Sequence, residues 1–249
     1  MVLWTLAERD LRARYKQSFL GAAWAVMTPL LLMVVFNLFV RRVTTVATQG
    51  VPYQLFSYVG LLPWTFYSSA LTSGGQSLVG SQALLNKIAC PREVFPLAQV
   101  ATSAFNALVA TSVLGVLFAI HGFAPRTTTV WVPVPLAVLA AFTVGTTLFV
   151  AAVVVYVRDV RHALPIAMQL GLFATPVAYG MEAIPARAHQ LYAVLNPLGP
   201  VIDTLRRTVL FGVGPDWSLL GPAAAAATAW LIVGYAVFKR LEVGFADVA

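Results

Sequence analysis

The N-terminal segment is basic and amphipathic, and a long uncharged apolar stretch follows it directly. From Gln17 to Val40 the sequence has no charged residue, which is enough for a helix to cross the roughly 30 Å hydrocarbon core of a bilayer. In a helix over residues 1–19, aromatic and aliphatic side chains share one face and basic side chains the other. The apolar face consists of Trp4, Ala7, Leu11 and Tyr15, and the basic face of Arg9, Arg12 and Lys16. We therefore expect a helix lying in the lipid headgroup layer, followed by a membrane span.

The composition also indicates a membrane protein. The chain is 59% hydrophobic and only 10% charged, whereas soluble domains carry about 25% charged residues. The net charge of +7 comes from basic residues beside apolar segments, where membrane topology and anionic headgroups explain them, so we expect no nucleic-acid partner. Cys90 is the only cysteine and the three histidines are far apart in the sequence, so we expect neither a disulfide within the chain nor a metal site.

Apolar runs predict an all-α integral membrane fold with about six spans in one domain over residues 1–249, with the bundle itself over 20–249. The predicted spans are residues 20–40, 54–80, 95–120, 131–157, 163–181 and 218–238. The second contains Gly74-Gly75, where a bend or break is expected. An even number of spans places both termini on one side. That side holds ten of the 16 basic residues, which predicts cytoplasmic termini.

Two connections between these spans differ from simple turns. The first, residues 81–96, mixes charges and contains two prolines, a pattern that predicts a brief cytoplasmic helix. The second, residues 182–217, alternates apolar turns with four prolines. Because a 36-residue structureless loop is uncommon in a compact protein, we expect short re-entrant helices at the outer face.

The sequence contains no motif for bond-making chemistry. It has no Gly-x-x-x-x-Gly-Lys-[Ser/Thr] phosphate loop, no His-Glu-x-x-His and no Gly-x-Ser-x-Gly. The nine carboxylates lie almost entirely at predicted span ends or in loops, which argues against a proton relay inside the membrane. We therefore expect no catalytic residue and no cofactor in this chain, and any uphill transport has to be driven by a partner.

Aromatic and mixed-charge segments leave alternatives open. Trp64, Phe66, Tyr67 and Tyr179 fit an aromatic belt at the membrane surface, and they also fit a lining on which sugar faces stack. The segment from Arg158 to His162 fits a solvated turn or a docking surface for a soluble partner. The sequence alone does not decide either case.

Several segments, in order along essentially the whole chain, resemble the permease subunits of polysaccharide ABC exporters, a type-2 ABC export family that moves O-antigen, teichoic acid, galactan and related lipid-linked glycans. The first is the stretch from Arg9 to Trp24, which runs RDLRARYKQSFLGAAW and is similar to the opening signature of these permeases. The other similar segments are 61–66 (LLPWTF), 91–97 (PREVFPL), 156–160 (YVRDV) and 195–198 (LNPL).

The resemblance implies a homodimer of six-span subunits in the bacterial cytoplasmic membrane, exporting a polyprenyl-diphosphate-linked polysaccharide. It implies two cytoplasmic P-loop ATPase subunits, which bind ATP and Mg²⁺ in place of this chain. It also implies an N-terminal interface helix, a coupling helix around residues 84–93 and outer helices around 185–211. Two alternatives are a permease for a lipid or drug and an integral-membrane glycan-processing enzyme.

The site residues that follow fall into three groups. Those expected at the ATPase contact are Leu84, Leu85, Asn86, Lys87, Pro91, Arg92, Glu93, Arg158 and Asp159. Those expected to meet the lipid headgroups and the diphosphate are Arg9, Arg12, Tyr15 and Lys16. The candidates for the channel lining are Trp64, Phe66, Tyr67 and Tyr179.

Overall fold

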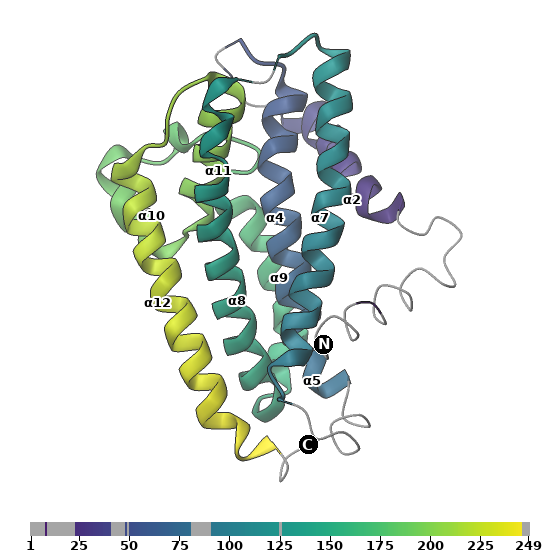
Figure 1. Ribbon diagram of the computed structural model, residues 1–249, viewed down its shortest axis with the longest axis vertical. Helices are drawn as coiled ribbons and strands as arrows, with labels where there is room; N and C mark the ends of the chain where they lie inside the picture. Colours follow the sequence, from purple (N-terminus) through teal and green to yellow (C-terminus); the bar gives the residue numbers. More distant parts are fainter. Residues whose placement is uncertain are drawn as a thin grey trace.

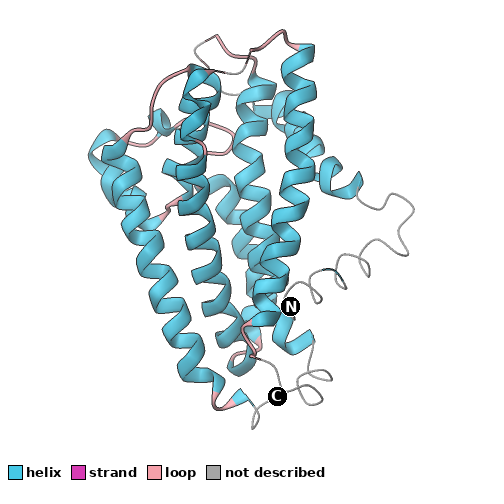
Figure 2. Cartoon of the chain, viewed as in Figure 1, coloured by secondary structure: helices cyan, strands magenta, loops and turns pink. Residues whose placement is uncertain are grey.

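The chain folds into a bundle of long helices that run side by side (Figure 1). The computed structural model describes residues 8, 23–40, 48, 50–80, 91–124 and 126–245. Within these residues there is no β-strand, which confirms the all-α prediction (Figure 2). The long elements are α2 (Ala23–Val35) with its π-helical continuation η1 (Phe36–Val40), α4 (Tyr53–Gly75), α7 (Val94–Ile120), α8 (Pro133–Tyr156), α9 (Asp159–Ala174) and α12 (Trp217–Glu242).

Four helical segments are long and apolar enough to cross a membrane. They are Ala23–Val40, Val94–Ile120, Thr127–Tyr156 and Trp217–Glu242, and each coincides with a predicted span. The other two predicted spans correspond to α4 and α9. Helix α4 has 23 residues and carries many polar side chains, whereas α9 has 16 residues and reaches only about 24 Å at 1.5 Å per residue.

Helix α4 is the centre of the bundle, and α2, α7, α8, α9 and α11 pack around it. Its apolar side chains are buried on nearly every side, and Leu55, Tyr58 and Leu61 are fully buried. The Tyr58 hydroxyl donates to the carbonyl of Ala110 in α7 at 2.8 Å. This surrounding protein explains why a polar helix is tolerated here, because its hydroxyls find partners inside the bundle rather than in lipid. As expected, α4 ends at Gly75, and the short α5 (Ser77–Gly80) follows.

Helices α8 and α12 pack along most of their length and cross at glycines. A Cβ added to Gly145 would lie 2.5 Å from the backbone of Trp230 and Leu231. One added to Gly234 would collide with the carbonyl of Gly145. The two backbones therefore touch directly, as at the small-residue helix crossings typical of membrane proteins.

The predicted span over residues 163–181 is wrong at both ends. Helix α9 starts at Asp159, and it stops at Ala174 because Thr175 precedes Pro176. A residue before proline is driven out of the helical region, and Thr175 is extended, with φ −96° and ψ 140°. The N–H of Thr175 makes the last helical hydrogen bond, to the carbonyl of Gly171 at 2.9 Å. Residues 175–180 then continue as turns and bends, with residues 175–178 buried.

The predicted short helices between the fifth and sixth spans are present. They are η3 (Met181–Ala183), η4 (Ala186–Ala188), α10 (His189–Leu195), α11 (Leu198–Arg206) and the π-helical η5 (Arg207–Phe211). All residues of α11 except Asp203 are buried. Helix α11 packs against α4, α8 and α12, so this non-spanning segment is covered by protein, as re-entrant structure at membrane depth requires.

Candidate functional site

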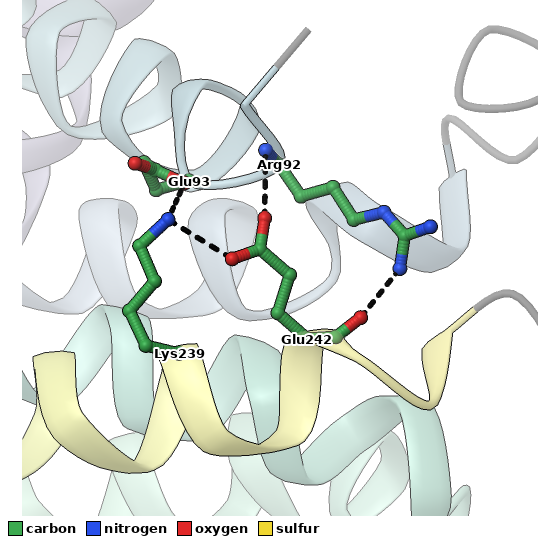
Figure 3. A network of polar contacts seen from close by, with 4 residues as sticks. All are labelled: Arg92, Glu93, Lys239 and Glu242. Atoms are coloured by element: carbon green, nitrogen blue, oxygen red, sulfur yellow. Dashed lines mark hydrogen bonds and ion pairs between the residues drawn. The ribbon is translucent and has the colours of Figure 1, made fainter. Parts of the chain in front are cut away.

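A cluster of four charged residues joins the start of α7 to the end of α12 (Figure 3). Lys239 Nζ donates to Glu93 Oε2 at 2.7 Å and to Glu242 Oε2 at 2.9 Å. Glu242 also binds Arg92 twice. Its Oε1 accepts from the Arg92 backbone N–H at 3.3 Å, and its carbonyl accepts from Arg92 Nη1 at 2.6 Å. We call Arg92, Glu93, Lys239 and Glu242 the charged clasp.

Local structure brings the four side chains together. Residues 91–93 form a turn that leads into α7, in which the N–H of Val94 donates to the carbonyl of Pro91 at 3.2 Å. Glu93 is the N-cap residue of α7. Lys239 and Glu242 are three residues apart in the last turn of α12 and therefore share one face of that helix. The turn and the helix end thus meet through pairs of residues that are 146 and 150 positions apart in the sequence.

Aromatic rings pack beneath the charged clasp. Phe245 stands edge-on to Phe238 with the ring centroids 5.7 Å apart, and its own ring lies 5.7 Å from the Arg92 guanidinium carbon. Tyr156, the last residue of α8, donates to the carbonyl of Leu241 at 2.8 Å. The ends of α8 and α12 and the turn before α7 therefore form one connected body at this end of the bundle, which we call the clasp end.

The charges of the clasp are partly screened by water. The side chains of Lys239 and Glu93 are 36% and 20% exposed. Burial by itself raises the pKa of Glu93, but the hydrogen bond and the charge of Lys239 outweigh it and hold that pKa below its usual value. Ion pairs with this exposure contribute at most about 1 kcal/mol each. The ion pairs of the clasp therefore contribute modestly to the contact between the turn before α7 and the end of α12.

The structure places only some of the residues expected at an ATPase contact. Leu84, Leu85, Asn86 and Lys87 lie outside the described residues. Pro91, Arg92 and Glu93 form the turn before α7, and Arg92 and Glu93 belong to the charged clasp. Arg158 and Asp159 connect α8 to α9 at the clasp end and are exposed.

Sequence analysis missed Lys239 and Glu242 as partners of this turn. It assigned neither Lys239 nor Glu242 to a site. Their spacing of three residues at the end of an apolar helix was the available signal, since such pairs interact on a helix surface. The pairing with residues 92 and 93 depends on how α7 and α12 pack, which the spacing does not reveal.

The aromatic candidates for a channel lining lie inside the subunit. Trp64, Phe66 and Tyr67 are only 5%, 9% and 8% exposed. Tyr67 stacks on Phe142 at 5.3 Å, while Trp64 lies against Gly171 of α9, where a Cβ would meet its ring at 2.9 Å. Their burial favours a role in packing between α4, α8 and α9. Their contact with a transported molecule stays a prediction.

The fourth candidate, Tyr179, belongs to a network around the buried Arg206, which sequence analysis did not identify as a site residue. Arg206 of α11 is 1% exposed and donates to the carbonyls of Pro176, Val177 and Tyr179 at 2.5–2.8 Å. It also donates to the carbonyl of Phe56 at 3.1 Å, and its guanidinium carbon lies 3.7 Å from the centroid of the Phe56 ring. Arg206 thereby donates hydrogen bonds to backbone carbonyls that lie just after the end of α9, where the helix no longer supplies donors.

The residues expected at the lipid headgroups cannot be placed. Arg9, Arg12, Tyr15 and Lys16 lie outside the described residues, as does the 1–19 segment except for Glu8. Within the described part of the chain, no group of three or more His, Cys, Asp or Glu residues could hold a metal ion.

The described residues form a helical bundle with four segments long and apolar enough to cross a membrane, which defines a multi-pass membrane protein. Comparison with known families makes the class specific: residues 1–210 match the ABC-2 type transporter family. The chain belongs to this family. Membership identifies it as the permease part of an ABC transporter and implies an ATPase subunit as its partner.

Individual relatives are similar over nearly the whole chain. The O-antigen export system permease protein RfbA of Myxococcus xanthus is 31% identical over 248 residues, which cover 99% of this chain and 94% of that protein. RfbA of Klebsiella pneumoniae is 26% identical over 249 residues, with the same two coverages. The polysialic acid transport protein KpsM of Escherichia coli is 23% identical over 243 residues, which cover 94% of this chain and 91% of KpsM.

Proposed function

We propose that this chain is the permease subunit of an ATP-driven exporter that moves a polyprenyl-diphosphate-linked polysaccharide across the bacterial cytoplasmic membrane. The observation that carries the proposal is the similarity to O-antigen export permeases along 99% of the chain. The absence of a P-loop motif from the sequence agrees with it, because the energy then has to come from a separate subunit that binds ATP and Mg²⁺. The chain itself changes no covalent bond.

In the proposed orientation the clasp end faces the cytoplasm, together with both termini. Two ATPase subunits then contact the coupling segment around residues 84–93. The charged clasp and the ring of Phe245 join the last residues of that segment to α12. Because α12 packs along α8, a displacement of the coupling segment reaches two long helices as well as α7. The clasp is thus a mechanical connection between ATP hydrolysis and the bundle.

The exposed surface of helix α9 favours contact with a second copy of the chain. Only Leu164 of this helix is buried. Its exposed side chains include the apolar Ile166, Leu170 and Phe173 as well as the polar His162 and Gln169. Polar groups exposed to lipid are unfavourable, so this mixed surface suits a partner subunit or a wet path better than hydrocarbon. We propose that α9 borders a channel formed between two subunits, with Phe173 as its exposed aromatic residue.

The interface helix over residues 1–19 completes the proposal. Arg9, Arg12 and Lys16 would attract the diphosphate of the lipid carrier at the headgroup layer, with Tyr15 on the apolar face of the same helix.

Expression of the chain with its ATPase subunit in cells that lack their own exporter tests the proposal. We expect lipid-linked glycan to reach the cell surface, and ATP hydrolysis to require the ATPase subunit. ATP hydrolysis by the purified chain alone would contradict the assignment. Export of a lipid or drug with no movement of glycan would favour the alternative permease class.

Disulfide crosslinking tests the second copy. In a Cys90→Ser background, Leu170→Cys on α9 should form a covalent dimer, whereas Ala225→Cys on the exposed surface of α12 should not. A dimer through position 225 but not through 170 would place the interface elsewhere.

A further inference from the structure

An apolar groove of about 360 Å³ lies between α4, α7, α8 and the α11–η5 segment, in the half of the bundle away from the clasp. Its floor includes Val59 and Phe66 of α4, and its rims include Leu108 of α7 and Leu136 of α8. These two rim side chains are 72% and 45% exposed, so the groove is open toward the outside of the bundle. In Figure 1, α7 and α8 flank α4 on the viewer's side, whereas α9 lies behind it.

The walls of the groove are almost entirely apolar. Thr111 is the only lining residue with a polar side chain, and its hydroxyl donates to the carbonyl of Ala107 at 2.8 Å. A sugar or a polar drug would lose its hydrogen bonds with water in this groove and gain none in return. The volume and the lining suit a hydrocarbon chain.

The depth of the groove follows from a pair of tryptophans. Trp131, just before α8, and Trp217, the first residue of α12, form an edge-to-face pair at 5.6 Å and are 41% and 54% exposed. Exposed tryptophans at span ends mark the boundary between hydrocarbon and headgroups. The groove begins at Val132, directly after Trp131, and extends to Ala140, about 12 Å at 1.5 Å per residue. It therefore occupies about one leaflet of the hydrocarbon core.

An exposed cation, Arg126, lies beyond the tryptophans. Arg126 is exposed, and its guanidinium carbon lies 5.3 Å from the centroid of the Phe123 ring. It forms no ion pair within the described part of the chain, whereas Arg207 nearby has Asp216 at 4.0 Å. The stem of Arg126 packs beside Gly212, three residues after Val209 of the groove wall. The hydroxyl of Thr128 donates to the carbonyl of Thr208 and fixes this arrangement.

We propose that this groove binds one anionic phospholipid of the surrounding membrane, with an acyl chain between α7 and α8 and the phosphate at Arg126. The apolar groove and Arg126, which has no ion pair among the described residues, lie in the order in which such a lipid presents its acyl chain and its phosphate. The site opens on the face away from α9, so it is separate from the proposed channel and does not depend on the exported substrate.

Photocrosslinking tests the site directly. The full chain is placed in phosphatidylcholine nanodiscs that contain a small fraction of phosphatidylglycerol with a diazirine on its acyl chain. We expect crosslinks in α7 and α8 at the groove residues. A matching phosphatidylcholine probe should label them about fivefold less, since one arginine near the surface contributes about 1 kcal/mol toward an anionic lipid.

Two variants with matched controls separate the charge from the groove. Arg126→Gln should remove the preference for phosphatidylglycerol, whereas Arg187→Gln, an exposed arginine outside the groove, should retain it. Ala140→Phe should fill the groove and remove the labelling, whereas Ala225→Phe on the exposed surface of α12 should not. If Ala140→Phe does not fold, Ala107→Leu fills the same groove from α7 with a smaller side chain.

Four results would overturn the proposal. Equal labelling of the wild-type groove by both lipids would remove the role of charge. Labelling that survives in a folded filled-groove variant would place the lipid elsewhere. Displacement of the probe by polyprenyl phosphate but not by unlabelled phosphatidylglycerol would assign the groove to the carrier lipid. Absence of labelling in the wild-type protein, with the groove covered by another copy, would also count against a phospholipid.

Discussion

At the residue scale, Lys239 holds the charged clasp together because it binds carboxylates on both sides of the junction. We expect Lys239→Gln to lower the free energy of unfolding by about 1 kcal/mol, since two partly exposed ion pairs are lost. Thermal unfolding in detergent measures this change. Arg240→Gln is the matched control, because Arg240 is its exposed neighbour outside the clasp. An equal loss in both variants would show that the clasp contributes nothing specific.

The ion pair between Glu93 and Lys239 predicts that the stability of the protein depends on pH. The pKa of Glu93 is lower in the folded protein than its usual value, chiefly because the partner Lys239 outweighs the effect of burial. Its stabilisation is therefore complete above the usual carboxyl range and is lost as the pH falls through the folded pKa. We expect the stability difference between wild type and Lys239→Gln to be present at neutral pH and to vanish in strong acid. A difference that stays constant with pH would point to packing of the lysine stem.

Arg206 predicts a larger effect. Arg206→Met would leave four backbone carbonyls without their donor, at about 1–3 kcal/mol for each unsatisfied group. We expect little folded protein from this variant and an intermediate yield from Arg206→Lys, whose single ammonium cannot reach all four carbonyls. The measurement is the monodisperse fraction in size-exclusion chromatography. Arg187→Gln, at an exposed arginine, should behave as wild type.

At the element scale, the crossing of α8 and α12 depends on the absence of side chains. Gly234→Ala should force the helices apart, because the new methyl group would collide with the carbonyl of Gly145. We expect a lower unfolding temperature. Gly221→Ala lies in the same helix with open space around it and should be neutral or slightly stabilising, since alanine favours helix by about 1 kcal/mol over glycine. Similar effects at positions 221 and 234 would refute the close crossing.

At the scale of the whole molecule, the orientation in the membrane can be measured. In a Cys90→Ser background, Thr127→Cys lies at the end of the bundle opposite the clasp and Arg240→Cys at the clasp end, and both positions are exposed. If the clasp end is cytoplasmic, an impermeant thiol reagent added to intact cells labels position 127 and reaches 240 only after lysis. The reverse pattern would invert the proposed topology and remove the ATPase contact from the clasp end.

The sequence by itself determined the helical membrane class and the location of the long helices. Charge-free runs of this length have one low-energy solution in lipid, where every backbone group needs an internal partner. The break after Gly75 and the short helices before α12 also followed from local chemistry, because glycine and proline act within a few residues. Pro176 predicts the end of α9 at Ala174 in the same way, but the apolar composition of residues 163–181 extended the predicted span past it.

Only the tertiary structure decided which side chains meet. The pairing of Glu93 with Lys239 and the burial of Arg206 depend on how helices far apart in the sequence pack, and no spacing rule encodes that. The same holds for Trp64, Phe66 and Tyr67, whose residue types fit a belt or a channel lining, whereas the packing buries them inside the bundle. The periodicity of the sequence predicts which residues share a face of each helix. Which other helices cover that face depends on the packing of the whole fold.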